Sequence, residues 1–406
     1  MDALISTAAR ALAAGDPLAA LKRVGLRSDA AALALRGIAM AQLGDLARAR
    51  DLLRSAARAF GPKEPLASAR CVVAESEIAL VCRDLGRPMQ ALDAARATLE
   101  ALGDRVNAAH AGYLKARRLL LIGELDQAER TLAGVDPGTL PRPSRTGYEL
   151  VAAGIAIRRV RTEPARAALD RAARMAGEAG IAALTAEVDR ALRAFRAPAA
   201  RLIARATDRL VGLAEVEALL TSGTLVIDAT HGVARVGSTV TSLARRPILF
   251  AILRALAEAW PGDAPREMLL ARAFRARHAD ESHRARLRVE IARLREALRP
   301  LAALRATKTG FALVPHRAAA VAVLAPPIEG DHAELLTLLA DGEAWSSSSL
   351  ALALGISSRT AQRALEALAA AGKVESFGRG RACRWIAPSV PGFPTSLLLP
   401  APVPAG

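Results

Sequence analysis

Apolar residues recur every three to four positions through most of the first half of the chain. This spacing is typical of amphipathic helices that bury one face. Glycine- and proline-containing breaks interrupt the pattern at residues 15–17, 61–62, 103–104 and 136–138. Because Gly and Pro favour turns, the pattern predicts an array of helices joined by short connections. We expect this helical domain to cover residues 1–200.

Three of the breaks share a pattern: an aliphatic residue, a glycine and a polar residue, with an alanine five positions after the glycine. They are Leu43-Gly44-Asp45 with Ala49, Leu85-Gly86-Arg87 with Ala91, and Ile122-Gly123-Glu124 with Ala128. The glycine ends one helix in a left-handed conformation, and the small alanine lets the next helix pack closely. The pattern resembles tetratricopeptide repeats, whose helix pairs stack into a superhelix, although the spacing here is longer and irregular. The alternative is an ordinary helical bundle.

The following segment, residues 201–222, is expected to be a connecting helix, because Arg201, Arg205 and Arg209 would lie on one helical face. At Gly223 the period changes to the alternation of strands. Strands are expected at 224–228 and 233–240, helices at 247–259, 266–275 and 282–298, and a hairpin at 304–314. These elements form the expected second domain, residues 223–316.

This second domain resembles the OmpR-type winged-helix DNA-binding domain. The resemblance rests on LRVEIARLREAL at 287–298 and TGFAL at 309–313, with 243–253 supplying the first helix. It implies a small sheet, three helices and a C-terminal hairpin, with the third helix reading the major groove and the hairpin reaching the minor groove. Glu290 and Ala292 depart from that family, which often has a His and a basic residue at the matching positions.

Helical geometry divides the third helix into two stripes. Leu287, Ile291, Leu294 and Leu298 share the stripe that must face the core. The opposite stripe contains Ser282, Arg286, Val289 with Glu290, and Arg293. Arginine binds guanine with two hydrogen bonds and also binds phosphate, so this helix is the first candidate DNA interface. The candidate DNA-binding residues here are Ser282, Arg284, Arg286, Arg288, Arg293 and Arg295, with Lys308 near the tip of the hairpin.

A proline-containing linker, expected over 317–330, leads to a third domain at 331–387. Its sequence resembles winged-helix modules of the MarR and IclR kind, on SLALALGISSRTAQRALEAL at 349–368 and GKVESFGRGRACRW at 372–385. Gly355 makes the turn between two helices, and Ser357 caps the second of them. The Pro-rich end, residues 388–406, is expected to be disordered.

On the last helix of this third domain, the alanines and leucines at 361, 364, 365 and 368 are expected to point inward. Arg359, Gln362 and Arg363 would then face outward as a set that can read bases. The hairpin that follows is expected to bring Arg379, Arg381 and Arg384 to phosphates.

Charge points to a polyanionic partner. Lys and Arg number 56 against 40 Asp and Glu, a net charge of +16. Residues 201–320 are the densest basic block, with 20 basic and 11 acidic residues. Residues 321–406 have 6 basic and 7 acidic residues, so the third domain alone should bind DNA weakly.

Other classes of function find little support. The three cysteines have neither paired nor zinc-finger spacing, so we expect no disulfide framework, metal or cofactor. No stretch is apolar enough for a membrane span, and no catalytic constellation can be assembled, so an enzyme is not expected.

The sequence therefore predicts a mainly α protein: an N-terminal helical-repeat superhelix followed by two winged-helix domains. The hypothesis is a cytoplasmic, nucleoid-associated transcription regulator, a homodimer that binds double-stranded DNA through its winged helices and a protein or peptide through its repeats. The alternative is a non-catalytic scaffold whose winged helices contact proteins. The near-neutral third domain and the departures at Glu290 and Ala292 favour that alternative.

Overall fold

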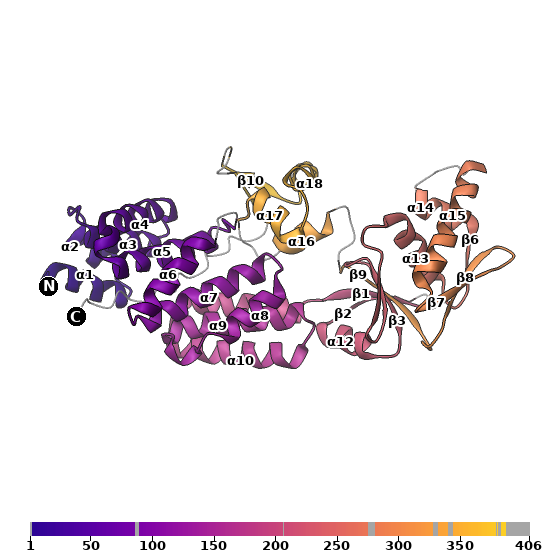
Figure 1. The fold of residues 1–406 in the computed structure, drawn as a ribbon, viewed down its shortest axis with the longest axis horizontal. Helices are drawn as coiled ribbons and strands as arrows, with labels where there is room; N and C mark the ends of the chain where they lie inside the picture. Colours follow the sequence, from indigo (N-terminus) through magenta and orange to yellow (C-terminus); the bar gives the residue numbers. More distant parts are fainter. Residues whose placement is uncertain are drawn as a thin grey trace. The chain divides into compact units, whose positions relative to one another are not determined.

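The chain is mainly helical, with small sheets (Figure 1). The structure is a computed structural model that describes residues 2–85, 89–205, 207–274, 281–327, 332–339, 344–378, 380 and 383–386. These residues form two compact units. Unit 1 comprises 1–159, 163–193 and the described residues from 334 onward, and unit 2 comprises 160–162 and 194–333.

Unit 1 begins with a row of helices in which each of α1 to α8 packs on its successor. The odd-numbered helices α1, α3, α5, α7 and α9 also pack on one another in succession, so they form a continuous layer. The helices are α1 Ala3–Ala13, α2 Pro17–Val24, α3 Ala30–Gln42, α4 Leu46–Phe60, α5 Pro65–Val81, α6 Gln90–Ala101, α7 Arg105–Leu121, α8 Leu125–Ala133, α9 Arg142–Arg158, α10 Thr162–Ala179 and α11 Ala182–Arg196, with short 3₁₀ turns at Gly61–Lys63 and Pro137–Thr139.

The glycine pattern correctly places two of its three turns. Gly44 and Gly123 have φ angles of +87° and +85°, a conformation that favours glycine. Asp45 accepts a hydrogen bond from the backbone N–H of Arg48 at 3.1 Å, which caps the next helix. Ala49 and Ala128 are fully buried where the next helices pack, as expected.

At Leu85-Gly86-Arg87 the predicted break between helices is present, but the end of the first helix and the packing of the alanine differ from the prediction. The turn after α5 lies at Arg83-Asp84, where Arg83 itself has a φ of +50° and Asp84 N donates to Ala79 O at 2.8 Å. Ala91 is exposed rather than packed between helices. Gly86 and Arg87 lie outside the described residues.

Unit 2 contains a six-stranded sheet in the order β2-β1-β9-β3-β4-β5. Neighbouring strands are antiparallel except for β3 and β9, which are parallel. The strands are β1 Ala200–Ala204, β2 Thr207–Val211, β3 Leu225–Asp228, β4 Val233–Val236, β5 Thr239–Ser242 and β9 Val321–Ala325, and helix α12 spans Leu213–Thr221.

Three sequence-based expectations fail in this sheet. The expected connecting helix 201–222 is the β1–β2 hairpin followed by α12, and the expected linker 317–330 contains the central strand β9. The single strand expected at 233–240 is two strands that turn at Gly237, whose φ is +56°. Short apolar segments fit either helix or strand, and pairing with distant strands decides between them. Every residue of β9 is buried, because Val321 and Val323 pack into one core and Leu324 into another.

The rest of unit 2 is a compact group of elements, here called the first module. Its elements are α13 Pro247–Ala259, β6 Asp263–Pro265, α14 Arg266–Phe274, α15 Glu281–Leu298, β7 Ala302–Ala306 and β8 Gly310–Pro315. The three strands form a sheet in the order β6-β8-β7. The three expected helices and the hairpin are present, whereas β6 was not foreseen.

The described residues from 334 to 386, with Ala333 at the start of the first helix, form a similar group, here called the second module, and all but Ala333 belong to unit 1. Its elements are α16 Ala333–Leu339, α17 Ser347–Leu354, α18 Ser358–Ala370, β10 Glu375–Phe377 and β11 Arg384–Ile386. Trp345 forms a two-way backbone bridge to Trp385 of β11, with N–O distances of 2.9 and 2.8 Å. Trp345 and Leu350 share one hydrophobic core with Leu85 and Leu119 of the helical row. The second module is therefore part of unit 1 rather than a separate compact domain, which fits the small core that so short a segment can build alone.

Candidate nucleic-acid interface

The core side of α15 fixes which of its residues face solvent. Leu287, Ile291, Leu294 and Leu298 are between 0 and 3% exposed, as the helical spacing predicts. They pack against α13 and the strands in the core of the first module. Burying this stripe leaves the arginines of the opposite and flanking faces in solvent.

Two of these arginines share one acidic partner at the start of the helix. Arg284 and Arg288 approach the carboxylate of Glu281 at 3.5 and 3.4 Å, and their side chains are 58% and 72% exposed. Ion pairs this exposed contribute about 0–1 kcal/mol, so a phosphate can displace Glu281. Ser282 is exposed in the same turn.

The remaining arginines of α15 differ in how firmly the fold holds them. Arg286 lies over the ring of Phe274 at 5.0 Å and is exposed. Arg295 donates to the carbonyl oxygen of Leu304 at 3.1 Å and lies 5.9 Å from the Phe311 ring. Arg295 is therefore bound along the sheet and less free than Arg286 to reach a ligand.

The sequence predicts Glu290 on the outward stripe, but this prediction is wrong. Glu290 is only 8% exposed. It lies three residues after Leu287 and four before Leu294, and it lines a cleft together with Arg246 and Pro247 at the start of α13. Its carboxylate pairs with Arg293 at 3.0 Å, and the Arg293 side chain is still 63% exposed. Arg293 therefore remains available, whereas Glu290 cannot contact bases directly.

A basic groove lies between α14, α15 and the start of β8. Its volume is about 480 Å³. It is lined by the guanidinium-bearing Arg266, Arg284 and Arg288 together with Thr309 and Phe311. The sequence analysis did not identify Arg266 as a candidate binding residue. The available signal was an arginine in the first turn of a helix, where acidic residues are favoured.

Lys308 is exposed in the turn that joins β7 and β8, close to this groove in the chain. Thr309, its neighbour, lines the groove itself. The expected basic residue therefore does sit at the tip of the expected hairpin. Arg284, Arg288 and Lys308 give this end of the first module three exposed cations, beside the carboxylates of Glu267 and Glu281.

The second module presents a smaller set of cations on α18. Ser357 accepts from the N–H of Thr360 at 3.1 Å and caps the helix, as expected. The inward positions 361, 364, 365 and 368 are 0–3% exposed, which confirms the predicted face. Arg359 and Arg363 are exposed on the other side.

Two expected contacts of the second module change in detail. Gln362 is partly buried and donates to Glu366 at 2.9 Å, so its amide is already engaged on the helix surface. Arg384 donates to the carbonyl of Cys383 at 3.0 Å and is partly buried. Arg379 and Arg381 lie outside the described residues. The α15 set belongs to unit 2 and the α18 set to unit 1, so each is a separate candidate interface.

Comparison of the chain with protein-family models, with curated proteins and with solved structures found no match. Within the part of the chain that the structure describes, no helix has both the length and the apolar character needed to cross a membrane.

Proposed function

We propose that this chain is a DNA-binding transcription regulator in which both modules are winged helices. The first module runs helix, strand, helix, helix, strand, strand, and its last strand lies between the other two. The second module follows the same order, with Trp345 bridging to β11 in place of the first strand. This order is typical of winged-helix domains, whose third helix enters the major groove of DNA.

The observation that carries the proposal is the exposure of arginines on the third helix of the first module. Arg284, Arg288 and Arg293 have side chains that are 58–72% exposed, although acidic neighbours lie within reach. Ion pairs this exposed add only about 0–1 kcal/mol to folding stability, so these guanidinium groups can exchange a carboxylate for another anion at little cost. Exposed, closely spaced guanidinium groups instead suit phosphates and guanine edges.

The helical row of unit 1 supports a role for this part in partner binding. Stacked helix pairs give the extended surfaces that tetratricopeptide-like superhelices use for peptides and proteins. We propose that the row binds a protein or peptide, or a second copy of the chain, in the cytoplasm where the nucleoid lies.

An electrophoretic mobility shift with sheared genomic duplex DNA tests DNA binding. We expect a retarded complex whose affinity falls by a factor of about 10³ or more between about 50 and 200 mM salt. The double variant Arg284→Ala plus Arg288→Ala should weaken the complex and flatten the salt dependence by about two phosphate contacts. A chain that shifts no DNA at low salt would refute the proposal.

A scaffold function is the second candidate, and one contact favours it. The second module packs α17 on another part of the same chain, because Ser349 is buried against the turn after α5, so a module of this kind can make contacts with protein. In a scaffold, the basic faces of α15 and α18 would recognise acidic protein segments. Co-purification of a protein partner by a chain that does not retard DNA would select this candidate.

A further inference from the structure

The turn between β7 and β8 is tightly bonded within itself. The N–H of Thr307 donates to Gly310 O at 3.0 Å, and the N–H of Gly310 donates to Thr307 Oγ1 at 2.9 Å. Lys308 and Thr309 occupy the two central positions. The other carbonyl and hydroxyl groups of the turn need hydrogen-bond partners outside it.

Arg266, the first residue of α14 directly after β6, donates to those carbonyls. Its backbone N–H donates to Thr309 O at 3.1 Å, and its guanidinium donates to Lys308 O at 2.9 Å and to Thr307 O at 3.2 Å. One residue thus binds three consecutive carbonyls of the turn. The same guanidinium lies 5.6 Å from the Phe311 ring, which further limits its movement.

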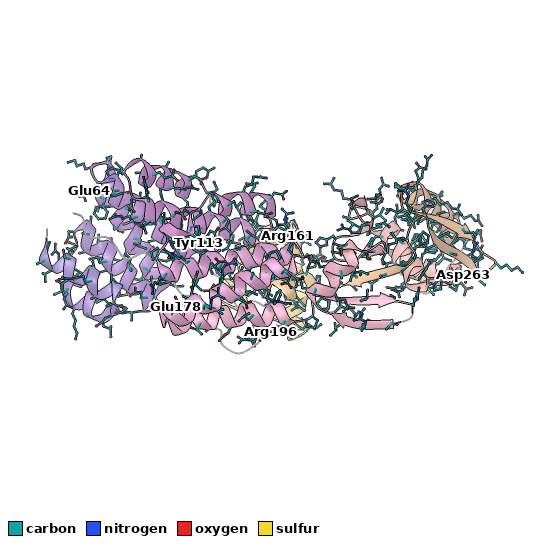
Figure 2. The ribbon with its side chains drawn as sticks, turned by 90° about the horizontal axis from the view of Figure 1, so that it is seen from below. Glu64, Tyr113, Arg161, Glu178, Arg196 and Asp263 are labelled. Carbon is teal, nitrogen blue, oxygen red and sulfur yellow. The ribbon has the colours of Figure 1, made fainter. Side chains whose placement is uncertain are left out.

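Asp263 satisfies the hydroxyls from the other end of β6. Its carboxylate accepts hydrogen bonds from both Thr307 and Thr309, and these bonds lower the pKa of the carboxyl group. Figure 2 labels Asp263 near the strands that bear the turn. Gly310 completes the arrangement, because a Cβ there would lie 1.8 Å from Ala264 O. The turn consequently packs directly against the backbone of β6.

The side chain of Lys308 stands outside this network. It is exposed, and among the described residues the structure shows no hydrogen bond or ion pair for its Nζ atom. Arg266 and Asp263 thus fix the backbone and the threonine side chains of the turn, whereas the Lys308 side chain extends into solvent. We propose that Asp263 and Arg266 are positioning residues that hold this turn so that Lys308 meets a DNA phosphate, an inference that rests on the proposed function.

The charge of Asp263 and its hold on the turn predict opposite effects of Asp263→Asn on DNA affinity. Asp263→Asn removes a negative charge beside a polyanion, so electrostatics alone would tighten DNA binding. The same change weakens the acceptor that both threonine hydroxyls share, and the loosened turn must then be ordered on binding. Ordering one long side chain and its loop corresponds to roughly threefold to tenfold in affinity.

The test measures the dissociation constant of the full chain for sheared genomic duplex DNA by fluorescence anisotropy at several salt concentrations. We expect Asp263→Asn, and the uncharged change Thr307→Val plus Thr309→Val, each to weaken binding roughly threefold to tenfold. Glu267→Gln is the matched control: Glu267 is an exposed carboxylate in the same groove, and its removal should leave binding equal or tighter. Lys308→Ala should weaken binding and lower the salt slope by about one phosphate contact.

A double-mutant cycle shows whether Asp263 acts through Lys308. With Lys308 already replaced by Ala, Asp263→Asn should cause no further loss. Equal or tighter binding by Asp263→Asn, or the same loss with and without Lys308, overturns the inference while leaving DNA binding in place. If the unaltered chain binds no DNA, the proposed function and this inference fail together. If thermal unfolding shows that Asp263→Asn does not fold, Thr309→Val takes its place in the test.

Discussion

Ser349 of α17 donates a hydrogen bond to the carbonyl oxygen of Arg83 at 2.6 Å, and its hydroxyl accepts from the N–H of Leu85 at 3.2 Å. Ser349 is 1% exposed, and Arg83 lies over the ring of Trp345 at 5.4 Å. The turn after α5 is thus bonded to a helix more than 260 residues away in the chain. The contact fixes α17 to the helical row, whereas Arg359 and Arg363 on the outer face of α18 remain exposed.

We predict that Ser349→Ala loosens the second module. The change leaves a buried carbonyl and a buried N–H without their partner, which costs about 1–3 kcal/mol. Chemical denaturation should show that loss, and hydrogen exchange should rise first in α17. Ser348→Ala is the control, because Ser348 is exposed in the same turn and should change stability by less than about 0.5 kcal/mol. Equal effects of the two variants would contradict the role of the contact.

A buried pair inside the helical row gives a second prediction. Glu77 and His110 are both fully buried, with Oε2 and Nε2 3.0 Å apart, next to Tyr113, which lies among the helices in Figure 2. Glu77→Ala takes this hydrogen-bond partner from the buried Nε2 of His110 and should lower the free energy of unfolding by about 1–3 kcal/mol. Urea denaturation measures this loss.

The exposed pair of Glu100 with Arg96 supplies the comparison. Glu100→Ala should cost less than about 1 kcal/mol, since solvent already screens that ion pair. Replacing both Glu77 and His110 with Leu should recover much of the stability lost in Glu77→Ala, because no uncompensated polar group remains. A Glu77→Ala variant as stable as Glu100→Ala would show that the buried pair is unimportant.

Stability in acid should depend on Asp104. Burial raises the pKa of this carboxyl group, but hydrogen bonds from Arg70 and Asn107 outweigh burial, and the pKa falls below its ordinary value of 3.8. A depressed pKa in the folded state stabilises the protein above the unfolded value and loses that effect as the pH falls through the folded value. The stability gap between the unaltered chain and Asp104→Asn should therefore be full at pH 7 and shrink below about pH 4.

The partner of Asp104 provides the control. Arg70 Nε lies 2.7 Å from Asp104 Oδ2, so Arg70→Ala should remove the ion-pair part of this stabilisation and leave the hydrogen bonds from Asn107. A double-mutant cycle should show coupling at pH 7 that declines in acid. Coupling that is unchanged across this range would exclude the ion pair as its source.

Base reading by α18 can be separated from simple charge. Arg359→Ala plus Arg363→Ala should weaken binding to preferred genomic sites by about 1–3 kcal/mol per lost base contact, and weaken binding to random DNA less. Arg48→Ala plus Arg58→Ala removes the same charge from exposed positions of α4 and should leave that ratio unchanged. Equal losses on preferred and random DNA would mean that α18 does not read bases.

Several features of this protein follow from the sequence alone. The helical row and the inward faces of α15 and α18 are set by local periodicity, because leucine and alanine spaced at helical intervals must bury together whatever surrounds them. The caps and glycine turns are equally local, as Ser357 and Gly355 illustrate. The exposed positions of Arg359, Arg363 and Lys308 followed from these patterns.

Tertiary structure alone decided the features that depend on distant partners. Strand β9 formed from an expected linker because β1 and β3 flank it, and Glu290 is buried beside a cleft that the start of α13 also lines. No pattern in the sequence indicated that Ser349 bonds to Arg83, or that Asp263 accepts hydrogen bonds from the turn between β7 and β8. Periodicity reports which face of a segment is apolar, whereas strand pairing and buried polar contacts depend on residues that the chain brings together only when it folds.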